Sequence, residues 1–348
     1  MKSSDKALIY TARSIAIVAI LFVICGFIII SLFFWNDRPT DRVISVQTEL
    51  VQAGAALEPL QKRSTPVDSW KAPHESTIPA GKYGDMIKYG KDLVVNTSKY
   101  FGPNGTVAQI SNGMNCQNCH LEAGTKPFAN NFSVFISSYP KKSNRSGKIE
   151  PPSERIAECF ERSLNGKVPD ESGKEIQAML AYMTWVGTGL NKGDLVFGNS
   201  TEKLKYLDRA ADPKLGLILY NNKCQSCHGR DGEGIIAEDK LSYVYPPLWG
   251  KDSYNDGAGQ YRLSNFAGFV KNNMPLGATY DNPQLSDEEA WDLAAFVNSQ
   301  PRPHRTQKKD YPDLTKKPID APYGPYADKY PEQQHKFGPY GSIVFATK

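Results

Sequence analysis

The sequence Cys116-Gln117-Asn118-Cys119-His120 has the form Cys-x-x-Cys-His, and the same form recurs as Cys224-Gln225-Ser226-Cys227-His228. In this pattern two thiols attach covalently to the vinyl groups of a haem, and the adjoining histidine supplies one axial ligand to the iron. A single match is also compatible with chance, with a redox pair or with half of a zinc site. Two matches in one chain favour two covalently bound haem c groups, one held by Cys116, Cys119 and His120 and one by Cys224, Cys227 and His228.

The chain has 348 residues, which leaves room for two domains of ordinary size plus appendages. Its net charge of +4 gives no indication of nucleic-acid binding, so an anionic ligand would need a local cluster of basic side chains. Four of the six cysteines belong to the haem motifs, and Cys25 lies in an apolar segment. Cys159 therefore has no disulfide partner. Because haem c is attached outside the cytoplasm, where spare thiols oxidise, Cys159 needs a specific role.

An uncharged apolar run at residues 14–35 follows a short basic segment at residues 1–13. As a helix this run would reach about 33 Å, enough to cross a hydrocarbon core of about 30 Å. A cleaved signal peptide is the alternative, but its apolar region would be shorter and would end at small residues rather than at Phe33-Phe34-Trp35. We therefore expect a single-pass anchor in a bacterial inner membrane, with residues 1–13 in the cytoplasm and the haem domains in the periplasm.

The rest of the chain is expected to divide into a linker, two haem domains and a tail, at residues 36–77, 78–200, 201–302 and 303–348. Apolar periodicity predicts helices at residues 85–97, 153–164 and 174–186 in the first domain and at 215–222, 263–272 and 290–298 in the second. Ser153 and Ser286 are the expected N-caps of two of these helices. The tail has no clear periodicity, and we expect it to wrap the domains. The expected fold class is mainly α, with two tandem class I cytochrome c-like domains after an N-terminal transmembrane helix.

Met274 is the candidate sixth ligand of the second iron, because a c-type iron with histidine on one side usually takes methionine on the other. A core methionine is the alternative. When the two closing helices are aligned, with residues 179–182 on residues 293–296, Cys159 falls within one residue of Met274. Cys159 is therefore the candidate sixth ligand of the first iron, or a reactive thiol. The methionines of the first closing helix compete for this role, although apolar packing accounts for them.

Basic residues surround this cysteine in the sequence. On a helix, Arg155, Cys159 and Arg162 stand at i, i+4 and i+7, so two guanidinium groups would flank the sulfur on one face. Nearby cations favour the thiolate. Ser163 and Lys167 continue the polar side of the segment. These five residues are the candidate catalytic residues, and a solvated surface face is the alternative explanation for the two arginines.

Four stretches, at residues 116–127, 155–167, 246–250 and 273–275, together resemble the dihaem cytochrome c family of thiosulfate dehydrogenases and tetrathionate reductases. The resemblance covers roughly residues 83–303. It implies that Cys159 ligates the active-site haem, and that the reaction joins two thiosulfates into tetrathionate with release of two electrons, or runs in reverse. Asn273 stands where some members of the family carry lysine.

The resemblance also implies thiosulfate and tetrathionate as substrates and a periplasmic electron partner such as a small cytochrome c. A thiolate ligand should lower the potential of the first haem relative to a methionine-ligated second haem, so electrons would leave through the second. The main alternative is a membrane-tethered dihaem electron carrier of a respiratory chain that has no substrate of its own. A third interpretation is a subunit of a multi-protein sulfur-oxidising system, with the cysteine carrying sulfur delivered by a partner.

Overall fold

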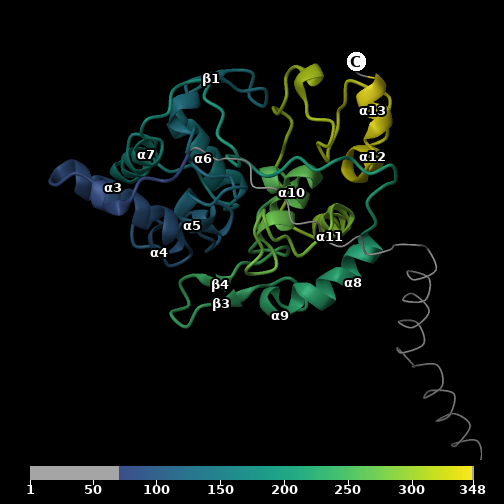
Figure 1. Ribbon diagram of the computed structural model, residues 1–348, viewed down its shortest axis with the longest axis horizontal. Coiled ribbons are helices and arrows are strands. Elements are labelled where there is room, and N and C mark those ends of the chain that lie inside the picture. The colour runs from purple at the N-terminus through teal and green to yellow at the C-terminus, as the bar shows by residue number, and fades with distance from the viewer. Residues whose placement is uncertain (1–69, 347–348) are drawn as a thin grey trace, which may run out of the picture. The chain divides into compact units, whose positions relative to one another are not determined.

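The computed structural model describes residues 70–346, which are mainly helical (Figure 1). The expected anchor at residues 14–35 and most of the expected linker lie outside the described residues. Within the described part of the chain, no helix is both long and apolar enough to cross a membrane.

The α-helices, in chain order, are α3 (Lys82–Val95), α4 (Thr97–Phe101), α5 (Leu121–Gly124), α6 (Pro152–Arg162), α7 (Lys174–Val186), α8 (Pro213–Lys223), α9 (Gln225–His228), α10 (Leu263–Asn273), α11 (Asp287–Ser299), α12 (Glu332–Phe337) and α13 (Gly341–Ala346). Single turns of 3₁₀ helix are η1 (Glu75–Thr77), η2 (Cys116–Asn118), η3 (Ile136–Ser138), η4 (Gly259–Tyr261) and η5 (Leu314–Lys316). The strands form two short antiparallel hairpins, β1 (Lys141–Lys142) with β2 (Ile149–Glu150) and β3 (Ile235–Ile236) with β4 (Tyr243–Tyr245).

Most of the expected helices are present, with shifts of a few residues at their ends. α7 spans the predicted residues, and Ser286 caps α11 through a reciprocal capping box with Glu289. The prediction that Ser153 caps α6 is wrong, because the helix begins at Pro152 and Pro151 stands at the N-cap. Proline suits the first turn of a helix, since its φ angle is already helical and its missing N–H has no partner there in any case.

The first hydrophobic core is built where α3 crosses α7. Ile87, Leu93 and Val94 of α3 are buried on one face together with Gly90. A Cβ atom at Gly90 would lie 1.9 Å from the carbonyl oxygen of Ala178, so the helices approach this closely only because position 90 lacks a side chain. Cys116 of the first Cys-x-x-Cys-His motif packs against the core built at this crossing.

The second hydrophobic core repeats this arrangement where α8 crosses α11. A Cβ atom at Gly216 would lie 2.0 Å from the carbonyl oxygen of Asp292 and 2.6 Å from the Cβ of Phe296. The corresponding neighbours of Gly90 are Ala178 and Tyr182. These pairs match the register in which the sequence aligned the two closing helices.

The C-terminal tail is ordered and contacts both cores, although its sequence lacks periodicity. His335, Phe337 and Ile343 are buried, and the latter two join the second core. Near the first core, Arg162 donates two hydrogen bonds of 2.8 Å to the carboxylate of Asp310. Both side chains are about 5 % exposed, so this is a buried ion pair. The backbone N–H of Tyr311 also donates to the carbonyl of Arg145.

The variant Asp310→Asn tests how far this ion pair stabilises the fold. It removes the nearer of the two carboxylates that compensate the buried guanidinium of Arg162 and leaves only Glu158, 3.9 Å from Nε, so we expect the free energy of unfolding to fall by about 3–5 kcal/mol in urea denaturation of the full chain. The matched control is the double variant Arg162→Met with Asp310→Leu, which removes both charges. Its free energy of unfolding should fall by less than that of Asp310→Asn. An equal loss in the two proteins would show that the uncompensated charge is not the cause.

Candidate active site

The first Cys-x-x-Cys-His motif is fixed by hydrogen bonds from the preceding helices. The backbone N–H of Cys116 donates to Thr97 Oγ1 over 3.0 Å, and the side chain of Asn115 accepts from the backbone N–H of Ser98 over 2.8 Å. The backbone N–H of His120 donates to the carbonyl of Cys116. The two thiols and the imidazole are thereby placed on one wall of a cavity of about 250 Å³.

Both motif histidines are held through Nδ1. Nδ1 of His120 lies 2.5 Å from the carbonyl oxygen of Asn130, and Nδ1 of His228 lies 2.8 Å from that of Pro246. A carbonyl oxygen only accepts, so Nδ1 carries the proton in each ring and Nε2 is the nitrogen left to bind a metal. Burial lowers the pKa of His120 to about 4 and also lowers that of His228. Both rings are therefore neutral at pH 7, which is the state a metal ligand needs.

The cysteine environments fit thioether attachment to a haem. Burial raises the pKa of Cys116 and of Cys119 to about 12, and raises that of Cys224 to about 11. A thioether sulfur is uncharged, so this burial is compatible with covalent attachment to a haem. The cavity lining is mostly apolar, as a porphyrin requires; its apolar members are Met114, Phe132, Val134, Phe135, Ile156, Phe160, Leu164, Met179 and Met183.

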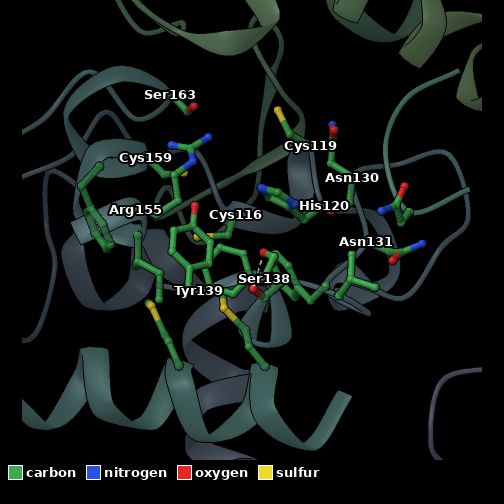
Figure 2. Close-up of a pocket in the computed structure, with 18 of the residues that line it drawn as sticks. Cys116, Cys119, His120, Asn130, Asn131, Ser138, Tyr139, Arg155, Cys159 and Ser163 are labelled. Carbon is green, nitrogen blue, oxygen red and sulfur yellow. Dashed lines mark hydrogen bonds between the residues drawn. The ribbon is translucent and has the colours of Figure 1, made fainter. Parts of the chain in front are cut away.

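Helix α6 carries the side chains on the side of the cavity opposite the histidine. Figure 2 shows Cys159 and Arg155 on one side of the pocket and His120 on the other. Ser163, the residue after the helix, also lines the cavity. Cys159 and the first motif thus line one cavity. Whether the sulfur ligates iron stays a prediction.

Charged groups gather on the face of α6 that carries Arg155 and Cys159. The pKa of Arg155 is raised, chiefly by the negative charge that Cys159 would carry as thiolate and against the effect of burial. Nη1 of Arg155 also lies 3.2 Å from Oε2 of Glu158. The side chain is 36 % exposed, so a ligand entering from solvent can reach it. Cys159 and Arg155 therefore form an electrostatically coupled pair that faces the cavity.

Two of the predicted catalytic residues are not brought to this cavity. Arg162 is committed to Asp310 and to the carbonyl of Gly257. Lys167 is exposed and lies outside the lining, and its backbone N–H donates to Ile110. The helical spacing that placed Arg162 beside the sulfur did not account for an acidic partner from the tail.

Several polar residues that line the cavity were not singled out from the sequence. Besides Asn115, which directly precedes the motif, they are Asn130, Asn131, Ser138, Tyr139, Lys141 and Asn199. All but the last come from the segment between the motif and α6, where Asn, Ser, Lys and Pro are frequent and no periodicity points to a site. Lys141 is the second basic side chain of the lining, beside Arg155.

The second motif is placed against the second core. Cys224 and Met274 are partly buried there, and Met274 directly follows α10 with an extended backbone. Cys159, by contrast, lies within α6. The two candidate sixth ligands therefore have different local structures despite their aligned positions, and the role of Met274 stays a prediction.

Asn273, which precedes Met274, is hydrogen-bonded to the segment that holds His120. Its buried side chain donates to the carbonyl of Phe128 over 3.1 Å and to that of Phe269 over 2.9 Å. Phe128 lies two residues before Asn130, whose carbonyl holds His120. The side chain at position 273 is thus engaged with the protein rather than directed to a ligand.

Comparison with known proteins gives consistent matches. The family model for cytochrome c matches residues 214–301. The chain is 37% identical over 234 residues to thiosulfate dehydrogenase of Stutzerimonas stutzeri, covering 67% of this chain and 73% of the relative. It is 38% identical over 242 residues to thiosulfate dehydrogenase of Allochromatium vinosum, covering 68% and 86%. Among solved structures, thiosulfate dehydrogenase TsdBA of Marichromatium purpuratum matches with a TM-score of 0.62 and 33% identity, over 67% of this chain and 50% of that one.

The variant Asn273→Ala tests the connection between the two sites. It leaves the carbonyls of Phe128 and Phe269 without their side-chain donor, so we expect the free energy of unfolding to fall by about 1–3 kcal/mol in urea denaturation. Asn282→Ala, at an exposed position, is the control and should stay within about 0.5 kcal/mol of wild type. Equal stability of all three proteins would mean that these bonds contribute nothing.

Proposed function

The chain belongs to the thiosulfate dehydrogenase family, and from this membership and the geometry of the cavity we propose that it oxidises two thiosulfates to tetrathionate. The reaction forms one bond between the two terminal sulfurs and releases two electrons, with no proton gained or lost. The observation that carries the proposal is that Cys159 and Arg155 line the same cavity as Cys116, Cys119 and His120. An electron carrier without a substrate has no need of a thiol paired with a cation at its haem.

The chain is a c-type cytochrome, and we propose that it holds two haem c groups. Cys116, Cys119 and His120 would hold the first, and Cys224, Cys227 and His228 the second. Each haem supplies a one-electron acceptor, so two match the electron count of the reaction. The repeated glycine crossings of α3 with α7 and of α8 with α11 support two tandem cytochrome c-like domains.

Charge repulsion is the main obstacle that the site must offset. Two thiosulfate dianions 4 Å apart repel by about 4 kcal/mol in water and by roughly 16 kcal/mol at an effective dielectric constant near 20. The guanidinium of Arg155 reduces this repulsion from the wall of the cavity. Ser163 adds a hydroxyl donor on the same side.

The thiol of Cys159 offers a second way to lower the repulsion. Its thiolate joins the terminal sulfur of one thiosulfate, and two electrons leave, so that a mixed disulfide with a single negative charge stands on the protein. A second thiosulfate attacks the sulfur of this adduct that came from the first; tetrathionate forms and the Cys159 thiolate is released. Because the adduct carries one charge instead of two, the repulsion in the second step is half that between two dianions.

Electrons would leave through the second haem site. If Cys159 were a ligand of the first haem and His228 and Met274 were ligands of the second, the sulfur anion would lower the potential of the first haem and would favour electron transfer toward the second. The acceptor would be a soluble periplasmic protein such as a small cytochrome c. The reverse reaction, tetrathionate reduction, uses the same groups.

Variants of Cys159 test the enzymatic role of this thiol. The full chain in detergent should oxidise thiosulfate with ferricyanide as acceptor, with tetrathionate quantified as the product. Cys159→Gly should lower turnover by at least about 100-fold, because the group that carries the first sulfur is lost. Haem content and reduction by dithionite serve as controls for folding.

Two outcomes would contradict the proposal. Full turnover of Cys159→Gly would refute the covalent mechanism. A wild-type protein whose haems are reduced by dithionite but which makes no tetrathionate would instead support a tethered electron carrier or a subunit that needs a partner.

We also propose that residues 14–35 anchor the protein in the inner membrane with its haem domains in the periplasm, on the basis of the uncharged apolar run. The protein should stay in the membrane fraction after extraction at alkaline pH. A variant in which a cleavable leader replaces residues 1–35 should be released from the membrane. Release of the full chain by alkali would exclude the anchor.

A further inference from the structure

Within residues 70–346, two basic side chains and no carboxylate line the cavity of the proposed active site. The two are Arg155 and Lys141. The charge of Arg155 is partly offset by Glu158 at 3.2 Å. Among the described residues, no carboxylate lies within ion-pair distance of Lys141. The positive charge of Lys141 is therefore the less compensated of the two.

The neighbouring arginines have acidic partners instead. Arg162 is paired with Asp310, and Arg145 lies 3.7 Å from Glu158 and 3.9 Å from Asp310. The acidic side chains of this region are thereby engaged on the side of α6 that meets the tail. Of these carboxylates only Glu158 also lies close to a cation of the cavity lining, Arg155, and Lys141 has neither of them within ion-pair distance.

Lys141 is held in place by a strand and by an aromatic ring. Its strand, β1, pairs with β2 in antiparallel register, with Lys141 opposite Glu150. Nζ of Lys141 lies 4.5 Å from the ring centroid of Tyr139, which is buried and lines the same cavity. A cation over an aromatic face is positioned without being neutralised. Glu150 is turned to another partner, since it accepts a hydrogen bond from Ser146.

The positive charges of Lys141 and Arg155 repel each other across the cavity lining. Burial lowers the pKa of Lys141, and the charge of Arg155 lowers it further, while Glu150 raises it in part. Two cations that repel each other in this way gain when an anion lies between them. The cavity is therefore suited to more than one negative charge.

We infer that Lys141, held over Tyr139, binds the second, incoming thiosulfate while Arg155 holds the thiosulfate at Cys159. This inference rests on the proposed function. Lys141 lies in an exposed hairpin, and its side chain lines the cavity. The lysine therefore lies between solvent and the rest of the site. An incoming dianion would meet this charge before it meets the singly charged adduct on Cys159.

Kinetics of three variants of the full chain test the inference. Lys141→Met removes the charge at similar side-chain length, and kcat/KM for thiosulfate should fall about 10- to 100-fold, as for loss of a charged hydrogen bond. Lys141→Arg keeps the charge and should stay within about threefold of wild type. Lys142→Met changes the adjacent exposed lysine, which does not line the cavity, and should leave kcat/KM unchanged.

Two further measurements separate anion binding from a structural effect. During turnover, mass spectrometry should show that Lys141→Met accumulates the Cys159 adduct, because the second step is slowed and the first is not. In calorimetry, dithionate, a sulfur dianion with no reactive terminal sulfur, should bind Lys141→Met about tenfold more weakly than wild type or Lys142→Met.

The outcomes distinguish this inference from the proposed function. Wild-type activity with unchanged kcat/KM and dithionate affinity in Lys141→Met would overturn the role of Lys141 alone. An equal fall in Lys142→Met would show a general surface-charge effect and would also overturn it. Absence of tetrathionate from the wild type would overturn the proposed function itself.

Discussion

The absence of a side chain at Gly90 is the constraint on which the first half of the structure depends. A methyl group there would overlap the carbonyl of Ala178, so only glycine lets α3 and α7 meet at backbone distance. This crossing builds the core from which the Cys-x-x-Cys-His loop is hydrogen-bonded and over which α6 lies. Gly216 does the same for α8 and α11. The same close helix crossing, with glycine at the contact, therefore occurs in both halves of the described chain, but the surroundings of the two motifs differ.

The difference between the copies is electrostatic. Helix α6 separates its charges, with Arg162 turned to a buried carboxylate of the tail and Arg155 turned to the cavity. A buried guanidinium needs a partner, whereas one that is partly exposed remains able to receive an anion. The tail thus determines which arginine is open to a ligand. At the second motif, Met274 follows a helix whose residues are almost all buried.

The sequence predicted the regular parts of this fold better than the irregular ones. α7 and the capped α11 were predicted because periodicity and a capping box are local signals. The order of the tail depends on long-range burial of residues such as His335 and Ile343, for which no local pattern exists. Cys159 was singled out because it was the one cysteine left unassigned, and its role stays a prediction. Lys141 was not singled out, because a two-residue strand has too little sequence to show a pattern.

The buried pair between Arg162 and Asp310 also has a consequence for the order of events during synthesis. A chain that emerges N-terminus first presents Arg162 well before Asp310 exists, so the guanidinium of Arg162 stays hydrated until almost the whole polypeptide has been made. Final desolvation of the helix that carries Cys159 must then be a late step of maturation. A nonsense mutation between codons 200 and 310 would accordingly disable the thiol site from a distance, even with every residue of the cavity intact.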